Sequence, residues 1–175
     1  MFCDDLCNTF CSKQLVTAAK SGDVDAFCEL YEIHKRKLFN YAYYKLGNVH
    51  DAEDVVQDCM MTAFEQLNKL RKPEAFSSWI YTILYHGCVS AVKEQISRRS
   101  NSDINLYENI ISYDNEAEFA REELKQALNI LTDNDKNIVL LCVVGGLKSG
   151  EVAKIMGLTA VNVRQRLHRS LHKMR

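Results

Sequence analysis

The chain has 175 residues, of which 47% are apolar and 26% charged, and its formal net charge is -1. This composition is that of a globular protein with one ordinary domain or two small ones, and not that of a disordered chain. No apolar run approaches the roughly 18 residues that span a bilayer, and the N-terminus lacks the basic and apolar regions of a secretion signal, so we expect a cytoplasmic protein without membrane insertion.

The N-terminal segment MFCDDLCNTFC places Cys3, Cys7 and Cys11 at helical spacing beside apolar residues. Three thiols on one helix face could bind zinc or an iron-sulfur cluster with a fourth ligand, but this spacing matches no common metal site. We therefore expect these residues to pack or to contact a partner, and we expect no metal and no cofactor. The odd total of seven cysteines predicts free thiols instead of a disulfide framework.

Three amphipathic helices follow, because apolar residues recur with the 3.6-residue period of a helix. Asp23 is the expected N-cap of the first helix and Gly47 its end, and Asp51 is the expected cap of the second. Pro73 breaks the pattern, and a third helix is predicted over residues 76–99. The apolar stripe of the first helix is predicted to face the core: Phe27, Leu30, Tyr31, Leu38, Tyr41 and Ala42.

Residues 100–117 lack helical periodicity and are rich in Asn, Ser and acidic residues, which predicts a flexible acidic linker. The fold class is therefore all-α, with two small helical domains over residues 1–99 and 118–175. Residues 101–123 contain one basic and seven acidic residues, whereas residues 152–175 contain six Lys or Arg and no Asp or Glu. This asymmetry predicts a nucleic-acid face that the near-neutral total charge conceals.

The segment EVAKIMGLTAVNVRQRLHRS, which begins at Glu151, has the pattern of a helix, a tight turn and a second helix. Ala153 is the small residue needed where the two helices touch, Gly157 suits the turn, and Thr159 can cap the second helix. The pattern favours a DNA-reading helix over a solvated basic face, because the second helix presents side chains that bond base edges or phosphates. These side chains are Asn162, Arg164, Gln165, Arg166, His168 and Arg169.

With these residues identified, the chain resembles a bacterial extracytoplasmic-function (group 4) sigma factor of the sigma-70 family. The resemblance covers residues 23–175 and rests on DAEDVVQD, FSSWIYTI, LTDNDKNIVLL and EVAKIMGLTAVNVRQRLHRS in that order. It implies a factor that brings core RNA polymerase to promoters and opens them. The implied partners are the β′ clamp helices and the β flap of the polymerase and promoter DNA, and the resemblance leaves room for an anti-sigma factor.

The resemblance also implies roles for individual residues. Asp54, Gln57 and Asp58 would dock on the polymerase, and the basic C-terminal helix would read the -35 element. The -10 element would be held by the loop residues Asn68, Lys69, Arg71 and Lys72, which take a flipped base, and by Tyr85, His86 and Lys93 on the following helix. His86 stands where the family usually has Asn, and Ser90 where it usually has Asp. Phe76 and Trp79 are expected mainly in the core.

Two other functions fit parts of the sequence. A stand-alone helix-turn-helix transcriptional regulator would share the C-terminal pattern, but DAEDVVQD and the Pro73 loop would be unexplained. The second is a His-Asp metal phosphohydrolase, whose metal ligands could be imitated by His34, His50, Asp51 and Asp54. A capping role for Asp51 explains that residue with fewer assumptions. We assign no catalytic residue and expect that the protein is not an enzyme.

Overall fold

A computed structural model describes residues 3–100 and 115–174, and the side chains within residues 12–98 and 122–174. These ranges form helices and turns and no strand, which confirms the all-α prediction. Most of the expected linker lies outside the described residues, and helix α5 (Asn115–Asn129) already begins within its last residues. Cys3, Cys7 and Cys11 lie on α1 (Cys3–Lys20), but their side chains are outside the described set, so their role stays a prediction.

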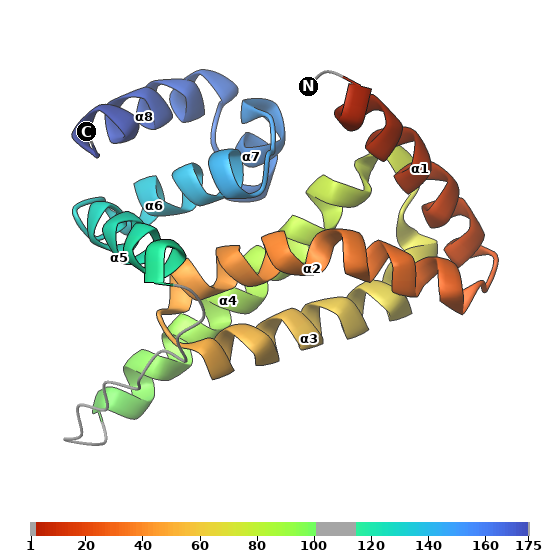
Figure 1. Ribbon diagram of the computed structural model, residues 1–175, viewed down its shortest axis with the longest axis horizontal. Coiled ribbons are helices and arrows are strands. Elements are labelled where there is room, and N and C mark those ends of the chain that lie inside the picture. Colours follow the sequence, from red (N-terminus) through yellow and green to blue (C-terminus); the bar gives the residue numbers. More distant parts are fainter. Residues whose placement is uncertain (1–2, 101–114, 175) are drawn as a thin grey trace.

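The N-terminal half contains α1, α2 (Val24–Leu46), α3 (Val49–Gln66) and α4 (Phe76–Ser100), with two short 3-10 turns, η1 (Leu67–Lys69) and η2 (Pro73–Ala75), between α3 and α4. Helices α2, α3 and α4 pack on one another, and α1 packs on α2 and on the η1–η2 connection (Figure 1). Asp23 caps α2 by accepting from the Ala26 amide at 3.0 Å, and Gly47 ends it, as predicted. The predicted cap of α3 was wrong: Asn48 accepts from the His50 and Asp51 amides, so the helix begins earlier.

The core of this half is built from the apolar stripes read in the sequence. Tyr41, Leu38 and Leu30 of α2 are fully buried, but Tyr31, placed in the same stripe, is 36% exposed. Phe76 is buried and Trp79 packs against the core while partly exposed, so both contribute to packing as expected. Burial of such large side chains supplies the main driving force for folding.

The C-terminal half contains α5, α6 (Asp133–Val139), a π-helical turn η3 (Leu140–Val144), α7 (Ser149–Met156) and α8 (Ala160–Lys173). Helix α8 packs on α6 and α7 (Figure 1). Thr132 caps α6 by accepting from the Asp135 amide at 3.3 Å. Gly145 ends the α6–η3 segment, and Gly146 after it has φ +69°.

The two halves also pack on each other, a contact that the sequence did not predict. Turn η3 contacts α2, and α7 contacts α4. Lys45 of α2 is 8% exposed and forms an ion pair with Asp133 at the start of α6. Gly145 lies so close to Tyr81 of α4 that an added Cβ atom would stand 3.1 Å from the tyrosine ring and 2.6 Å from the Leu141 carbonyl oxygen. Buried apolar residues of both halves consequently form one cluster.

Candidate nucleic-acid and polymerase interfaces

Helices α7 and α8 are joined by a turn with well-defined backbone contacts. Gly157 has φ +67°, a left-handed conformation that favours glycine, and the Leu158 amide donates to the Ala153 carbonyl at 2.9 Å. Thr159 then caps α8 by accepting from the Asn162 amide at 3.2 Å. Ala153 and Val163 are buried where the two helices meet. The predicted helix-turn-helix is therefore confirmed, with each of its three signature residues in the expected role.

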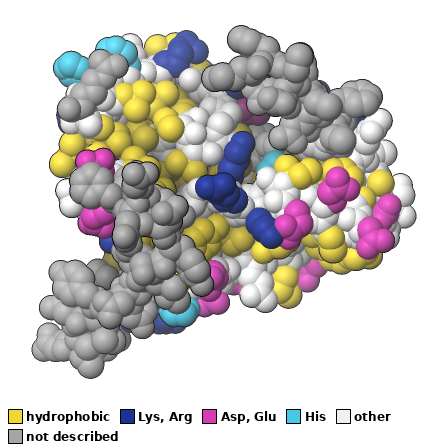
Figure 2. All heavy atoms as spheres, viewed as in Figure 1, with side chains coloured by type: hydrophobic (Ala, Val, Ile, Leu, Met, Phe, Trp, Pro, Cys, Tyr) yellow, Lys and Arg dark blue, Asp and Glu magenta, His cyan; other side chains and the backbone are white. Residues whose placement is uncertain are grey.

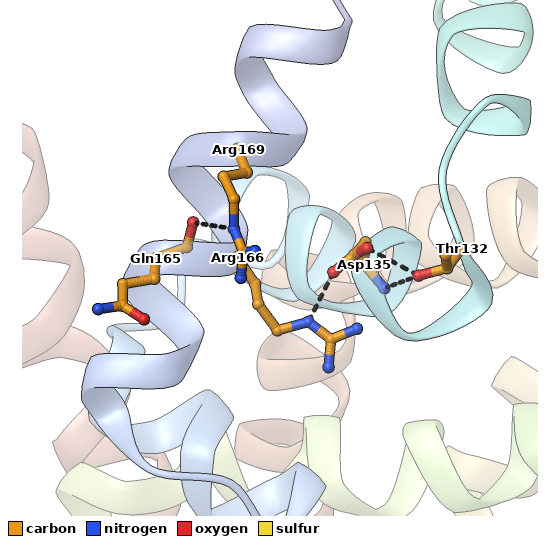
Figure 3. Close-up of polar contacts among 5 residues, drawn as sticks. All are labelled: Thr132, Asp135, Gln165, Arg166 and Arg169. Atoms are coloured by element: carbon orange, nitrogen blue, oxygen red, sulfur yellow. Dashed lines mark hydrogen bonds and ion pairs between the residues drawn. The ribbon is translucent and has the colours of Figure 1, made fainter.

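The outer face of α8 presents polar and basic side chains to solvent. The exposed members of the predicted set are Asn162, Arg164, Gln165, His168 and Arg169. Gln165 points away from α6, and Arg169 Nε donates to the Gln165 carbonyl at 3.4 Å (Figure 3). Ser170 and Val163 lie on the opposite, buried side. The helix is therefore amphipathic, with a free face suited to a polyanion.

Arg166, the sixth member of that set, differs from the others because it points back into the fold (Figure 3). Its Nε donates to Asp135 Oδ1 at 2.7 Å, and only 22% of its side chain is exposed. Thr132 Oγ1 donates to the other carboxylate oxygen of Asp135 at 2.7 Å. Burial opposes the charged form of Asp135, but hydrogen bonds from Arg166 and Thr132 and the positive charge of Arg166 outweigh it and lower its pKa below 3.8. A DNA contact by Arg166 stays a prediction and would have to compete with this ion pair.

The connection between α3 and α4 gathers the loop residues of the predicted -10 set. Asn68, Lys69, Arg71 and Lys72 are all exposed, and Leu70 at the centre is buried. The Ala75 amide donates to the Lys72 carbonyl at 3.0 Å, and Pro73 begins η2. Three cations and an amide side chain therefore project from a short, anchored segment. Lys20 of α1, which sequence reasoning missed, donates to the Leu70 carbonyl at 2.6 Å.

The other members of the predicted -10 set lie on α4, away from this loop. His86 is ten residues beyond Phe76, which corresponds to roughly 15 Å along the helix axis. Tyr85 is half-buried, and its pKa is raised by burial and then by the negative charge of Asp133, so it faces the C-terminal half. Lys93 is exposed nearly two turns beyond His86. The structure brings the loop residues together but does not bring Tyr85 and His86 to them.

The predicted polymerase-docking residues share the outer face of α3. Asp54, Gln57 and Asp58 are exposed, and the two aspartates line a groove of about 530 Å³ between α3 and α4, with His86 on the facing helix. Asp51, at one end of this groove, accepts from Gln95 Nε2 at 2.6 Å.

Two exposed apolar residues that sequence reasoning missed continue the α3 face. Met61 and Phe64 are exposed, and they follow Gln57 at the four- and seven-residue spacing that keeps residues on one helix face. That spacing is the signal that could have found them.

Comparison with known proteins accounts for both halves of the molecule. Residues 30–98 match the family model of Sigma-70 region 2, and residues 121–174 match that of Sigma-70, region 4. The chain belongs to the sigma-70 family. Both matched ranges fall within the predicted domains, and α8 with its exposed polar face lies in region 4, while α3 and the loop of residues 68–72 lie in region 2.

The related proteins place this sigma factor in the extracytoplasmic-function type. The ECF RNA polymerase sigma factor SigW of Bacillus subtilis (strain 168) is 24% identical over 93% of this chain and 94% of its own length. The RNA polymerase sigma factor SigV of the same organism is 30% identical over 81% of this chain and 84% of its own. The solved structure of the sigma factor RpoE from Bartonella quintana, in complex with the anti-sigma factor NepR, is similar in fold, with a TM-score of 0.73 and 21% identity over 85% of this chain and 93% of that one.

The two alternative functions lose their support. A stand-alone regulator does not account for the region 2 match. Among the described residues, no group of three His, Cys, Asp or Glu side chains could hold a metal ion. The ring of His34 packs on Phe76 with centroids 5.4 Å apart, and burial, aided by the charge of Lys37, lowers the pKa of His34 to about 4.

None of the described helices has the length and hydropathy needed to cross a membrane.

Proposed function

The chain is a sigma factor that directs core RNA polymerase to specific promoters, and we propose that it divides this task among three surfaces. Helix α8 reads the -35 element, residues 68–72 with α4 hold the -10 element, and α3 docks on the β′ clamp helices of the polymerase. The observation that carries the proposal is the free polar face of α8 on an anchored helix-turn-helix, because such a face is what a reading helix presents to the major groove.

At the -35 element, the residues of α8 have separable tasks. Arg164, Gln165 and His168 are exposed and can bond base edges, which discriminate one sequence from another. Asn162 and Arg169, also exposed, are suited to the flanking bases and phosphates. Arg166 contributes mainly by holding α8 to α6, because its guanidinium already binds Asp135.

At the -10 element, the loop of residues 68–72 supplies the first contacts with single-stranded DNA. The charges of Lys69, Arg71 and Lys72 attract phosphate, and the amide of Asn68 can bond a flipped base. His86 and Lys93 extend this surface along α4. Tyr85 joins it only after the C-terminal half moves away from α4, since Tyr85 is half-buried beside Asp133 in the packed form.

The polymerase contacts use both halves of the chain. The carboxylates of Asp54 and Asp58, with Gln57 between them, pair with basic side chains of the clamp helices, while Met61 and Phe64 add apolar contact area. The β flap is proposed to bind exposed apolar residues of the C-terminal half, where hydrophobic side chains gather on the face shown in Figure 2. Among the described residues of this half, Ile130, Val143 and Leu171 are exposed apolar side chains.

The proposed partners also indicate how the protein would be inhibited and where it would act. An anti-sigma factor that covered these same surfaces would hold the protein inactive. The protein would act in the cytoplasm, where the polymerase transcribes, and it would need no catalytic residue and no cofactor of its own.

The test is reconstitution of the full-length chain with core polymerase on promoter DNA. The wild-type chain should co-elute with core polymerase and support factor-dependent transcription. The double variant Asp54→Arg, Asp58→Arg should lose co-elution without losing helical content, because both side chains are exposed. The control is Asp25→Arg, Glu29→Arg, a pair that is also exposed and has the same spacing on α2, which should co-elute normally. Undiminished co-elution of the first variant would remove the docking assignment.

A further inference from the structure

Helix α1 braces the connection that carries the proposed -10 loop. It lies before residue 30, where the region 2 match begins, and it packs on α2, on η1 and on η2 (Figure 1). Val16 and Ala19 of α1 are buried. The helix therefore contacts both sides of the segment that contains residues 68–72.

The most direct of these contacts is made by a lysine ammonium group. Lys20 Nζ donates to the Leu70 carbonyl oxygen at 2.6 Å, across a sequence separation of 50 residues. Leu70 is only 5% exposed, and its own amide donates to the Leu67 carbonyl at 3.1 Å. A charged donor makes a short and strong hydrogen bond, so the backbone of Leu70 is held through both its amide and its carbonyl group. Leu70 is the centre of the loop, with two of the four exposed polar residues before it and two after it.

The end of α1 that carries Lys20 is itself well anchored. The Gly22 amide donates to Ala19 at 3.1 Å and the Asp23 amide to Ala18 at 3.2 Å, the paired bonds of a Schellman helix end. Asp23 then caps α2, so the short connection between α1 and α2 is held by hydrogen bonds at both helix ends. Among the described residues, the only other polar contact between α1 and the η1–η2 connection joins Lys13 and Glu74 at 2.7 Å, and both side chains are about half exposed. An exposed ion pair of this kind contributes little, so Lys20 is the principal polar tether.

We propose that Lys20 is a positioning residue, which holds the backbone of residues 68–72 in the shape that accepts the flipped base. The inference rests on the base-capturing role proposed above for this loop. A loop that is already ordered loses less conformational entropy when the base enters, so its affinity for that base is higher. Lys20 does not contact the base in this scheme, and its effect passes through the Leu70 carbonyl.

The experiment measures binding of single-stranded DNA to the reconstituted holoenzyme. The probe is a non-template-strand oligonucleotide from a promoter on which the holoenzyme initiates, with each base of the -10 element replaced in turn by an abasic site. For the wild-type holoenzyme, one abasic position should weaken binding by about ten-fold, because that base is captured. A wild-type protein that bound every abasic probe as well as the intact strand would refute the proposed role of the loop itself.

Three variants then test Lys20 separately. Lys20→Met keeps the aliphatic stem but removes the donor, and it should reduce the ten-fold discrimination to about three-fold or less while binding the abasic probe normally. Lys20→Arg keeps a cationic donor and should retain discrimination. Lys13→Met, which removes the exposed ion pair, should also retain it.

Two results would overturn the inference while leaving the proposed function intact. Full discrimination by Lys20→Met would show that the tether does not shape the loop. An equal loss of affinity for intact and abasic strands would show that Lys20 binds phosphate directly. Retained helical content, a single cooperative unfolding transition and unchanged co-elution with core polymerase should accompany the expected result, because a general folding defect would alter all three.

Discussion

Arg166 of α8 and Asp135 of α6 form an ion pair, with 2.7 Å between Nε and Oδ1, that joins the helix proposed to read DNA to α6 (Figure 3). Asp135 also receives a hydrogen bond from Thr132, the residue that caps α6. The pair is mostly shielded, with 22% and 18% of the two side chains exposed. Arg164 and Gln165, its neighbours on α8, are exposed on the free face.

Removing either partner of this pair should destabilise the C-terminal half. Arg166→Ala and Asp135→Ala should each lower the free energy of unfolding by about 1 to 3 kcal/mol, because each leaves a shielded charge without its partner. Thermal unfolding followed by circular dichroism measures the change. If Arg166 instead acted as a phosphate contact, Arg166→Ala would weaken DNA binding without changing stability, and Asp135→Ala would not weaken DNA binding.

The same pair predicts a dependence of stability on pH. The pKa of Asp135 lies below 3.8 in the folded protein, so its contribution is present above the unfolded pKa and is lost as pH falls through the folded value. The difference in melting temperature between the wild type and Asp135→Asn should therefore be largest near neutral pH and should shrink as the pH falls below about 4. A difference that stayed constant from pH 7 to pH 3 would contradict this account.

The close contact between Gly145 and Tyr81 predicts that the two halves separate when a methyl group is added there. Gly145 has φ -73°, which alanine also adopts, so the effect of Gly145→Ala is steric: the new Cβ would meet the Leu141 carbonyl oxygen and the Tyr81 ring. We expect a loss of about 1 to 3 kcal/mol and a larger radius of gyration in X-ray scattering. Gly150→Ala is the control, because no atom lies within 4 Å of a Cβ built there. Equal behaviour of the two variants would show that the contact does not hold the halves together.

The ion pair between Lys45 and Asp133 predicts a non-additive double-mutant cycle. Lys45 is almost fully buried, whereas 73% of the Asp133 side chain is exposed. Asp133→Ala should therefore cost about 1 to 3 kcal/mol, because it deprives a buried ammonium group of its carboxylate. The added change Lys45→Met should restore part of that loss, since it replaces the buried charge with an apolar side chain of similar length. Strictly additive unfolding free energies would indicate that the two side chains do not interact.

Contacts between residues close together in the sequence could be predicted, whereas contacts between distant residues could not. Asp23 and Thr159 cap their helices through bonds to an amide three residues away, so the local pattern was enough to find them. Lys45 and Asp133 are 88 residues apart, and nothing in either segment indicates the other.

Position on a helix, by contrast, does not settle which way a side chain turns once a partner is near. The sequence grouped Arg166 with the exposed cations of α8, because it does not show which way the Arg166 side chain turns. Asp135, 31 residues earlier, binds that side chain and turns it toward α6. The assignment of Asp51 as a helix cap failed in the same way. Asn48 takes the capping role, and Gln95, 44 residues later, binds the Asp51 carboxylate.

The face of α8 predicts two separable effects on DNA binding. Phosphate contacts raise affinity for any sequence and steepen its dependence on salt, whereas base contacts discriminate between sequences. Replacing Arg164, Gln165 or His168 with alanine should cost roughly 1 to 3 kcal/mol on a promoter with the correct -35 element and less on one with that element scrambled.

Lys173, which is exposed at the end of the same helix, is the matched control for these substitutions. Lys173→Ala should weaken both DNAs alike and flatten the salt dependence by up to about one unit of slope. The measurement is a titration of the holoenzyme against the two promoter duplexes at several salt concentrations. If all four substitutions lowered both affinities equally, α8 would be a nonspecific anchor, and promoter selection would have to reside in the loop of residues 68–72 and α4.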